Sequence, residues 1–141
     1  MELLKEYLDL TIFGILGIMG FITLWVAIER VLFYRSLRLS DFNHAAVLNI
    51  ELTRNLTALS IVGSNAPFVG LLGTVVGVLI TFYDMGQNQS IDTGSIMTGL
   101  ALALKATAAG IAIAIPTIMI YNSLMRKVDV INSLFLAQTQ R

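Results

Sequence analysis

The chain lacks several residue types on which the chemistry of proteins commonly depends. Its 141 residues include no cysteine and a single histidine, His44. The absence of cysteine excludes disulfides and thiolate metal sites. The remaining polar residues show neither the spacing of metal ligands nor that of a nucleophile with an acid–base partner. We therefore expect no enzyme, no metal and no cofactor, and we interpret His44 as a solvated helix residue.

Charge is also scarce. Only 13% of the residues are charged and the formal net charge is zero, whereas 56% are hydrophobic. A balanced charge gives no general attraction to nucleic acid. The surface of a soluble domain needs more charged residues than this chain offers. The composition therefore predicts a membrane protein.

Three apolar runs, at residues 10–28, 66–83 and 96–121, account for this composition. A helix needs about 20 apolar residues to cross the hydrocarbon core. We predict an all-α integral membrane protein with one domain over residues 1–141, spans at about 8–29, 64–84 and 95–121, and cytoplasmic helical parts at about 30–63 and 122–141. The first run is not a cleavable signal, because acidic residues precede it and no small-residue cleavage site follows.

Basic residues give the predicted orientation. Arg30, Arg35, Arg38 and Arg54 lie between the first two spans, and Arg126, Lys127 and Arg141 follow the third. The loop between the second and third spans has two aspartates and no basic residue, and Lys5 is the one lysine before the first span. Cytoplasmic segments carry the excess of basic residues. We therefore expect the N-terminus on the outer side of the membrane and the C-terminus in the cytoplasm.

The cytoplasmic parts have amphipathic patterns. Ser40 is a candidate cap for a helix that would run from residue 41 to 83, and four leucines recur at helical spacing: Leu48, Leu52, Leu56 and Leu59. The tail repeats the pattern with Val128, Ile131 and Phe135. Packing between copies in a homo-oligomer is the favoured interpretation, because such narrow stripes make a poor core. The alternative is that the stripes pack against one another within the chain.

Small residues dominate the spans, and two prolines interrupt them. Gly73 and Gly77 form a GxxxG pair with Gly70 one turn earlier, and span three carries many alanines together with Gly110. This spacing allows close approach of helix backbones in lipid. Pro67 and Pro116 lie within spans two and three. Each is either an ordinary kink, tolerated because neighbours satisfy the freed carbonyl, or part of a functional cavity.

Lys105 is the only charged residue in the middle of a span. It lies about 15 Å from the outer end of span three, too deep for its side chain to reach the interface easily. Such a residue costs about 2.5–3.5 kcal/mol to insert and by default faces protein or water. No acidic residue of the chain lies at the same depth, so we expect a counter-ion from another polypeptide, from water or from lipid. Snorkelling or loss of the proton is the alternative.

Two segments carry a resemblance to a known family. Residues 65–78, NAPFVGLLGTVVGV, and residues 99–122, GLALALKATAAGIAIAIPTIMIYN, resemble the corresponding spans of the ExbB/TolQ proteins, relatives of the flagellar stator protein MotA. The shared patterns APFVGLxGTVxG and ATAxGxxxAIPxxxxYN are long and specific. The short cytoplasmic part is similar to the ExbB branch of the family.

The resemblance implies a homopentamer in the bacterial inner membrane, with a periplasmic N-terminus. The pentamer surrounds a pore that holds helices of an ExbD-like protein, each with a protonatable aspartate. It implies that proton flow through this complex drives a TonB-like protein, which energises import of iron-siderophores and similar nutrients across the outer membrane. The polar positions of the family fall on Thr74 and Thr107, which would line the proton path. Leu102 occupies the position where many family members have a glutamate.

The nearby lysine gives a hypothesis of its own: Lys105 pairs with the partner's aspartate and keeps it ionised until a proton arrives. A purely structural role for this pair is the alternative. Lys105 and Thr107 lie about 160° apart around the helix, so they cannot both point straight at the pore. Either one of them faces a neighbouring helix or the lysine side chain curls round.

A TolQ-like role in envelope integrity and division is the alternative within the family. A non-conducting scaffold is the alternative outside it, and a self-sufficient transporter is disfavoured because the spans hold no carboxylate.

Overall fold

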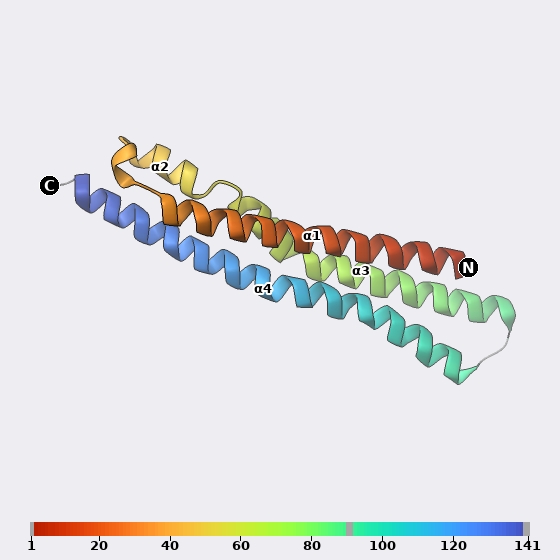
Figure 1. Ribbon diagram of the computed structural model, residues 1–141. Helices are drawn as coiled ribbons and strands as arrows, with labels where there is room; N and C mark the ends of the chain where they lie inside the picture. The colour runs from red at the N-terminus through yellow and green to blue at the C-terminus, as the bar shows by residue number, and fades with distance from the viewer. Residues whose placement is uncertain (1, 90–91, 140–141) are drawn as a thin grey trace.

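Three long helices run side by side along the molecule (Figure 1). The structure, a computed structural model, describes residues 2–89 and 92–139. Its elements are α1 (Glu2–Ser36), the short 3₁₀ helix η1 (Leu39–Asp41), α2 (Ala45–Leu52), α3 (Leu56–Asn88) and α4 (Thr93–Thr139). At a rise of about 1.5 Å per residue, the 47 residues of α4 form a helix about 70 Å long.

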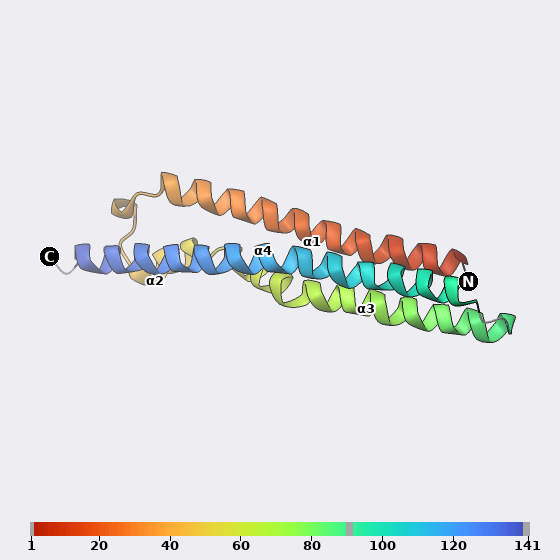
Figure 2. The ribbon, with the colours of Figure 1, turned by 90° about the horizontal axis from the view of Figure 1, so that it is seen from below.

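The two ends of the bundle differ. The N-terminus and the connection between α3 and α4 lie at one end, which we call the loop end (Figures 1 and 2). The C-terminus lies at the other end, where α2 packs against α4, and we call this the α2 end. At the loop end Asp92 caps α4, since its Oδ1 accepts from the Gly94 amide at 3.2 Å and its Oδ2 from the Ser95 hydroxyl at 2.8 Å. These hydrogen bonds hold the pKa of Asp92 below its ordinary value, and the bond from the Ser95 hydroxyl contributes most.

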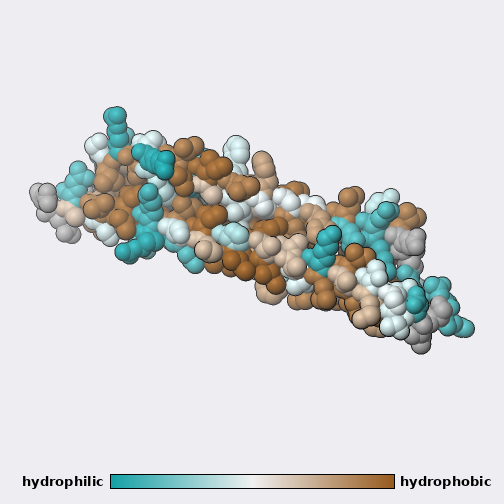
Figure 3. Space-filling model, turned by 60° about the horizontal axis from the view of Figure 1, so that its bottom comes forward, coloured by the Kyte–Doolittle hydropathy of each residue, from teal (hydrophilic) through white to brown (hydrophobic). Residues whose placement is uncertain are grey.

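All three long helices are suited to a membrane. Segments Leu3–Ser36, Leu56–Asn88 and Thr93–Thr139 are long and apolar enough to cross one. In the view of Figure 3, apolar residues cover most of the middle of the molecule, whereas hydrophilic residues gather towards its two ends. The prediction of an all-α protein with three helices able to span a membrane is confirmed, and each predicted span lies within one of these helices.

The α2 end contains the larger apolar core. Leu48, Leu52, Leu56 and Leu59 are at most 2% exposed. They pack with Val26 and Tyr34 of α1 and with Leu124, Val128 and Phe135 of α4. The preferred prediction, that these stripes pack between copies, is therefore wrong: one chain buries them by itself, because α1 supplies the side of the core that the stripes alone lack.

The predicted continuous helix from residue 41 to 83 is also wrong. Ser40 lies within η1, α2 begins only after the exposed His44, and the chain turns at residues 53–55 before α3 begins. Asn55 has a φ of 68°, in the left-handed region, which asparagine tolerates better than most residues do. The turn keeps the leucines in phase across the break, which explains why the spacing alone resembled one helix.

Arg30 connects α1 to the end of α2. Its side chain is 1% exposed, and its Nη1 donates to the carbonyls of Glu51 at 2.6 Å and Leu52 at 3.4 Å. Its Nε and Nη2 both donate to the carboxylate of Glu29. The Tyr34 hydroxyl donates to the Leu52 carbonyl at 2.5 Å. The last carbonyls of a helix have no partner within it. Arg30 and Tyr34 therefore satisfy the Leu52 carbonyl, and Arg30 gives the Glu51 carbonyl a second donor beside the Arg54 amide at 3.4 Å.

We expect Arg30→Met to lower the free energy of unfolding by about 2–3 kcal/mol, because it removes charge-assisted hydrogen bonds to buried carbonyls. Tyr34→Phe removes one hydrogen bond and should cost about 1 kcal/mol. Thermal unfolding of the detergent-solubilised protein measures both changes. Arg126→Met is the matched control, because Arg126 is exposed on α4 and its loss should leave the transition unchanged. Equal transitions for Arg30→Met and this control would contradict the role given to Arg30.

Candidate functional site

The contact between α3 and α4 is built from small residues. A Cβ atom added to Gly70 would lie 2.5 Å from the Ala106 carbonyl oxygen, and one added to Gly110 would lie 2.5 Å from that of Ala66. Gly73 and Gly77 continue the row. A Cβ atom added to Gly73 would lie 2.9 Å from the Ala106 Cβ, and one added to Gly77 would lie 3.0 Å from the Ala103 Cβ. The two backbones therefore touch over several turns. At Gly70 and Gly110 they are too close for any side chain larger than a hydrogen atom.

Two threonine hydroxyls lie inside this contact. The Thr74 and Thr107 hydroxyls are hydrogen-bonded to each other across the helix pair, and we call them the hydroxyl pair. Thr74 Oγ1 also donates to the Ala103 carbonyl at 2.8 Å, and the Gly70 carbonyl lies 3.4 Å from both hydroxyls. Both side chains are half-buried. The glycine row is the reason that they meet, because it brings the two backbones close enough for such short side chains.

The hydroxyl pair has fewer protons than acceptors. Each hydroxyl has one proton, and the possible acceptors are the Gly70 carbonyl, the Ala103 carbonyl and the other hydroxyl. Several arrangements of the two protons are therefore compatible with one arrangement of the oxygens. A hydroxyl that can donate and accept at once is able to exchange its proton with water or with a protonated group. The hydroxyl pair is thus a short hydrogen-bonded chain inside the α3–α4 contact.

Lys105 does not belong to this contact. Its side chain is exposed on the single chain, and its Nζ lies 5.8 Å from the centroid of the Phe13 ring on α1, at the outer range of a cation–π contact. Within residues 2–89 and 92–139, the ion pairs are Lys5–Asp84 and Glu29–Arg30, so Lys105 is in neither. Lys105 and Thr107 thus lie on different sides of α4. Leu102 is 53% exposed and lines a cavity at the loop end.

A second pair of threonines joins α1 to α4. The Thr23 and Thr117 hydroxyls are 3.0 Å apart, and the two residues are 6% and 0% exposed. Each hydroxyl also lies within hydrogen-bond distance of the carbonyl four residues earlier in its own helix. The sequence offered no signal for this pairing, because most threonines in a span bond only within their own helix.

The two prolines lie within continuous helices. Pro67 is half-buried in α3 and Pro116 is exposed on α4. Neither lines the cavity at the loop end or the shallow groove beside Arg126 and Asp129. Among the described residues, no group of three or more histidine, aspartate or glutamate side chains is placed to hold a metal ion.

Comparison with known proteins gives consistent matches. Residues 34–136 match the MotA/TolQ/ExbB proton channel family. The chain is 52% identical to a biopolymer transport protein ExbB of Helicobacter pylori (strain J99) over 135 residues, which cover 96% of this chain and 93% of that protein. It is also 52% identical to an ExbB of Aquifex aeolicus over 128 residues, 91% of this chain and 86% of the relative. A putative biopolymer transport protein ExbB-like 2 of Helicobacter pylori is 47% identical over 128 residues.

Proposed function

Because the chain belongs to the MotA/TolQ/ExbB proton channel family, we propose that it is the ExbB-type subunit of an inner-membrane proton channel that energises transport across the outer membrane. The observation that carries the proposal is the hydroxyl pair, Thr74 with Thr107, inside the contact of two apolar helices. In this proposal five copies surround the membrane helices of an ExbD-like partner, and the complex drives a TonB-like protein that powers import of iron-siderophores and similar nutrients.

The proposed orientation follows from the basic residues. The α2 end, with Arg35, Arg38, Arg126 and Lys127, lies in the cytoplasm, and the loop end lies in the periplasm. The cytoplasmic parts are then residues 30–63 and 122–141. Protons enter at the loop end and reach the hydroxyl pair, which lies beside the partner's aspartate. We place no enzymatic step and no cofactor in this scheme.

Native mass spectrometry of the complex, purified through a tag on this chain from its own membrane, tests the assembly. We expect five copies of the chain with a co-purifying single-span protein that has an aspartate in its span. The identity of this partner also distinguishes the ExbB role from a TolQ-like role in envelope integrity. A homo-oligomer without such a partner after gentle extraction would contradict the proposal and favour a non-conducting scaffold.

Lys105 is the proposed counter-ion of the partner's aspartate. Its exposure on the single chain leaves the ammonium group available to another polypeptide. In this proposal the long lysine side chain curls round α4 to reach the aspartate that lies beside the hydroxyl pair. In a low dielectric, opposite charges stabilise each other's ionised forms, so the pair keeps the aspartate ionised until a proton arrives. Arrival of the proton neutralises the aspartate and weakens the contact. The contact thus has two states, an ion pair before the proton arrives and a weaker contact afterwards.

We expect Lys105→Met to reduce siderophore uptake and proton flux by about tenfold, which corresponds to about 1.4 kcal/mol of lost coupling. Lys105→Arg keeps the charge and should retain most of the activity. Lys127→Met removes a lysine from the exposed face of α4 towards the α2 end and is the matched control. Uptake by Lys105→Met at the unmodified level, with normal complex assembly, would eliminate the ion-pair hypothesis.

A further inference from the structure

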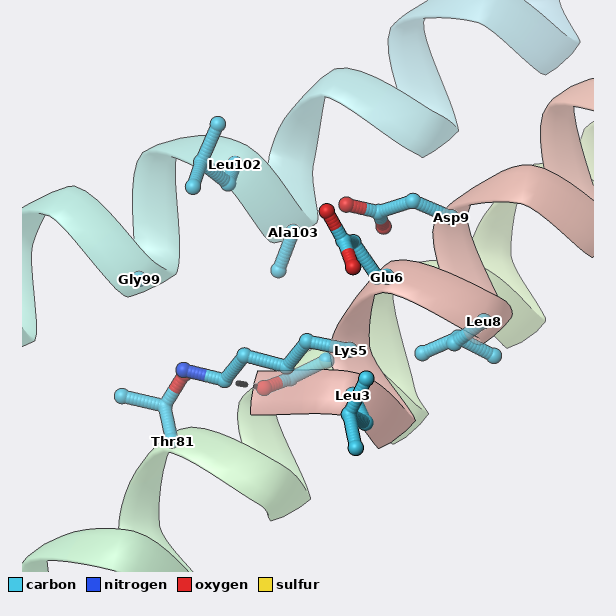
Figure 4. A pocket seen from close by; sticks show the side chains of 10 residues that line it. Leu3, Lys5, Glu6, Leu8, Asp9, Thr81, Gly99, Leu102 and Ala103 are labelled. Carbon is cyan, nitrogen blue, oxygen red and sulfur yellow. Dashed lines mark hydrogen bonds between the residues drawn. The ribbon is translucent and has the colours of Figure 1, made fainter. Parts of the chain in front are cut away.

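A cavity of about 390 Å³ opens at the loop end between the three long helices. Figure 4 shows how its walls are arranged. The first turns of α1 supply the charged residues Lys5, Glu6 and Asp9 together with two leucines, whereas α3 and α4 supply mainly small or apolar residues: Gly77, Thr81, Gly99, Leu102 and Ala103. At about 30 Å³ per molecule, the cavity has room for about 13 waters.

The charged groups of the cavity leave it negative. Lys5 Nζ lies 3.9 Å from Asp84 Oδ2 on α3, so its charge is balanced by that carboxylate. Glu6 and Asp9 are in neither of the ion pairs formed by the described residues, and α4 adds no titratable group to the lining. In Figure 4 the two carboxylates lie close together and project towards the α4 wall beside Ala103. A negative cleft with low-dielectric walls raises the local concentration of cations, protons included.

The floor of the cavity lies next to the hydroxyl pair. Gly77 and Ala103 line the cavity, and Gly77 is three residues, about 4.5 Å along the helix, from Thr74. Thr74 Oγ1 donates to the carbonyl of Ala103 at 2.8 Å. A Cβ atom added to Gly77 would lie 3.0 Å from the Ala103 Cβ, so the two residues leave no room for a larger side chain at Gly77. The small residues that allow close helix packing thus also bring the cavity to within about one helical turn of the hydroxyls.

We propose that this cavity is the hydrated entrance through which periplasmic protons reach the hydroxyl pair, and that Glu6 and Asp9 hold the incoming proton. A carboxylate takes one proton from bulk water and passes it to a water of the cavity. In each further step one O–H bond of a water breaks as a new O–H bond forms on its neighbour. One proton thus enters the chain of waters and one leaves it, and no other bond changes. The proposal rests on the proposed channel function and orientation.

Hydration of the cavity can be tested without measuring transport, because the chain contains no cysteine. Leu102 lines the cavity, whereas Leu104 on the same helix is not part of its lining, and the two leucines are similarly exposed at 53% and 60%. A charged methanethiosulfonate added from the periplasmic side of the assembled complex reacts only with an ionised, hydrated thiol. We expect it to label Leu102→Cys more than about tenfold faster than Leu104→Cys. Equal labelling rates, or no labelling of Leu102→Cys, would overturn the proposal.

The carboxylates are tested by proton flux into liposomes that contain the complex with its partner. We expect the double variant Glu6→Gln/Asp9→Asn to lose about tenfold in flux while it assembles normally. Asp92→Asn is the control, since Asp92 lies near the loop end but does not line the cavity. Unchanged flux in the double variant would overturn the role of Glu6 and Asp9 but not the hydration of the cavity. A wild-type complex without flux overturns the proposed function itself.

Discussion

Replacing Gly70 by alanine should strongly destabilise the protein, although the change adds a single methyl group. The new Cβ would lie 2.5 Å from the Ala106 carbonyl oxygen and 3.0 Å from the Cα of Thr107. Both are backbone atoms, which cannot rotate away as a flexible side chain can. The helices would have to separate, and this would also disrupt the contacts of Gly73 and Gly110. We expect a loss of about 3 kcal/mol, at the upper end of the usual cost of overpacking.

The same argument applies to Gly110→Ala from the other helix, because its Cβ would lie 2.5 Å from the Ala66 carbonyl oxygen. Size-exclusion profiles of the detergent-solubilised protein, recorded after heating to a series of temperatures, measure both losses. Gly14→Ala and Gly17→Ala are matched controls in α1, because a Cβ at either position meets nothing within 4 Å in the single chain. A Gly70→Ala protein that melts together with these controls would show that α3 and α4 do not approach as described.

Replacing Thr107 by valine should reduce proton flux about a hundredfold while the complex still assembles. Valine keeps the shape of threonine but cannot donate or accept a proton, and a positioned proton-transfer group commonly contributes about 10²-fold or more. The cost in stability is smaller, about 1 kcal/mol, because one hydrogen bond at the α3–α4 contact is lost. Thr74→Val should behave similarly and also removes the side-chain donor to the Ala103 carbonyl.

Flux into liposomes from the reconstituted complex provides the measurement. Thr107→Ser retains the hydroxyl and should retain most of the flux. Thr11→Val is the negative control, because the Thr11 hydroxyl is exposed on α1 and donates only to the Tyr7 carbonyl of its own helix. Wild-type flux in Thr107→Val would exclude the hydroxyl pair from the proton path and leave it a structural contact.

The membrane makes much of this fold predictable from sequence. A span must be long and apolar, so three runs of hydrophobic residues were sufficient to predict the three helices. The spacing of Gly70, Gly73 and Gly77 marked the face of α3 that now lies against α4. These signals are local, since they depend on the residues of one segment and on the solvent around it.

The features that the sequence did not reveal depend on several segments at once. Arg30 had been counted only among the residues that indicate orientation, and its burial requires the end of α2 to lie beside α1. The break at Asn55 was hidden because the leucines on either side remain in phase. Glu6 and Asp9 stood out only as acids before the first span, and the cavity that they line exists only where α1, α3 and α4 meet.

The uneven distribution of side-chain size along the bundle has a consequence for the substitutions that it tolerates. At the α2 end, large aliphatic and aromatic side chains interlock, and Arg30 ties α1 to the end of α2. Towards the loop end, glycines and alanines join α3 to α4, and α1 is held by the buried side chains of Ile12 and Leu16 and by the Lys5–Asp84 ion pair. The two kinds of packing are sensitive to opposite changes: the α2 end to a loss of side-chain volume, and the α3–α4 contact to a gain of volume.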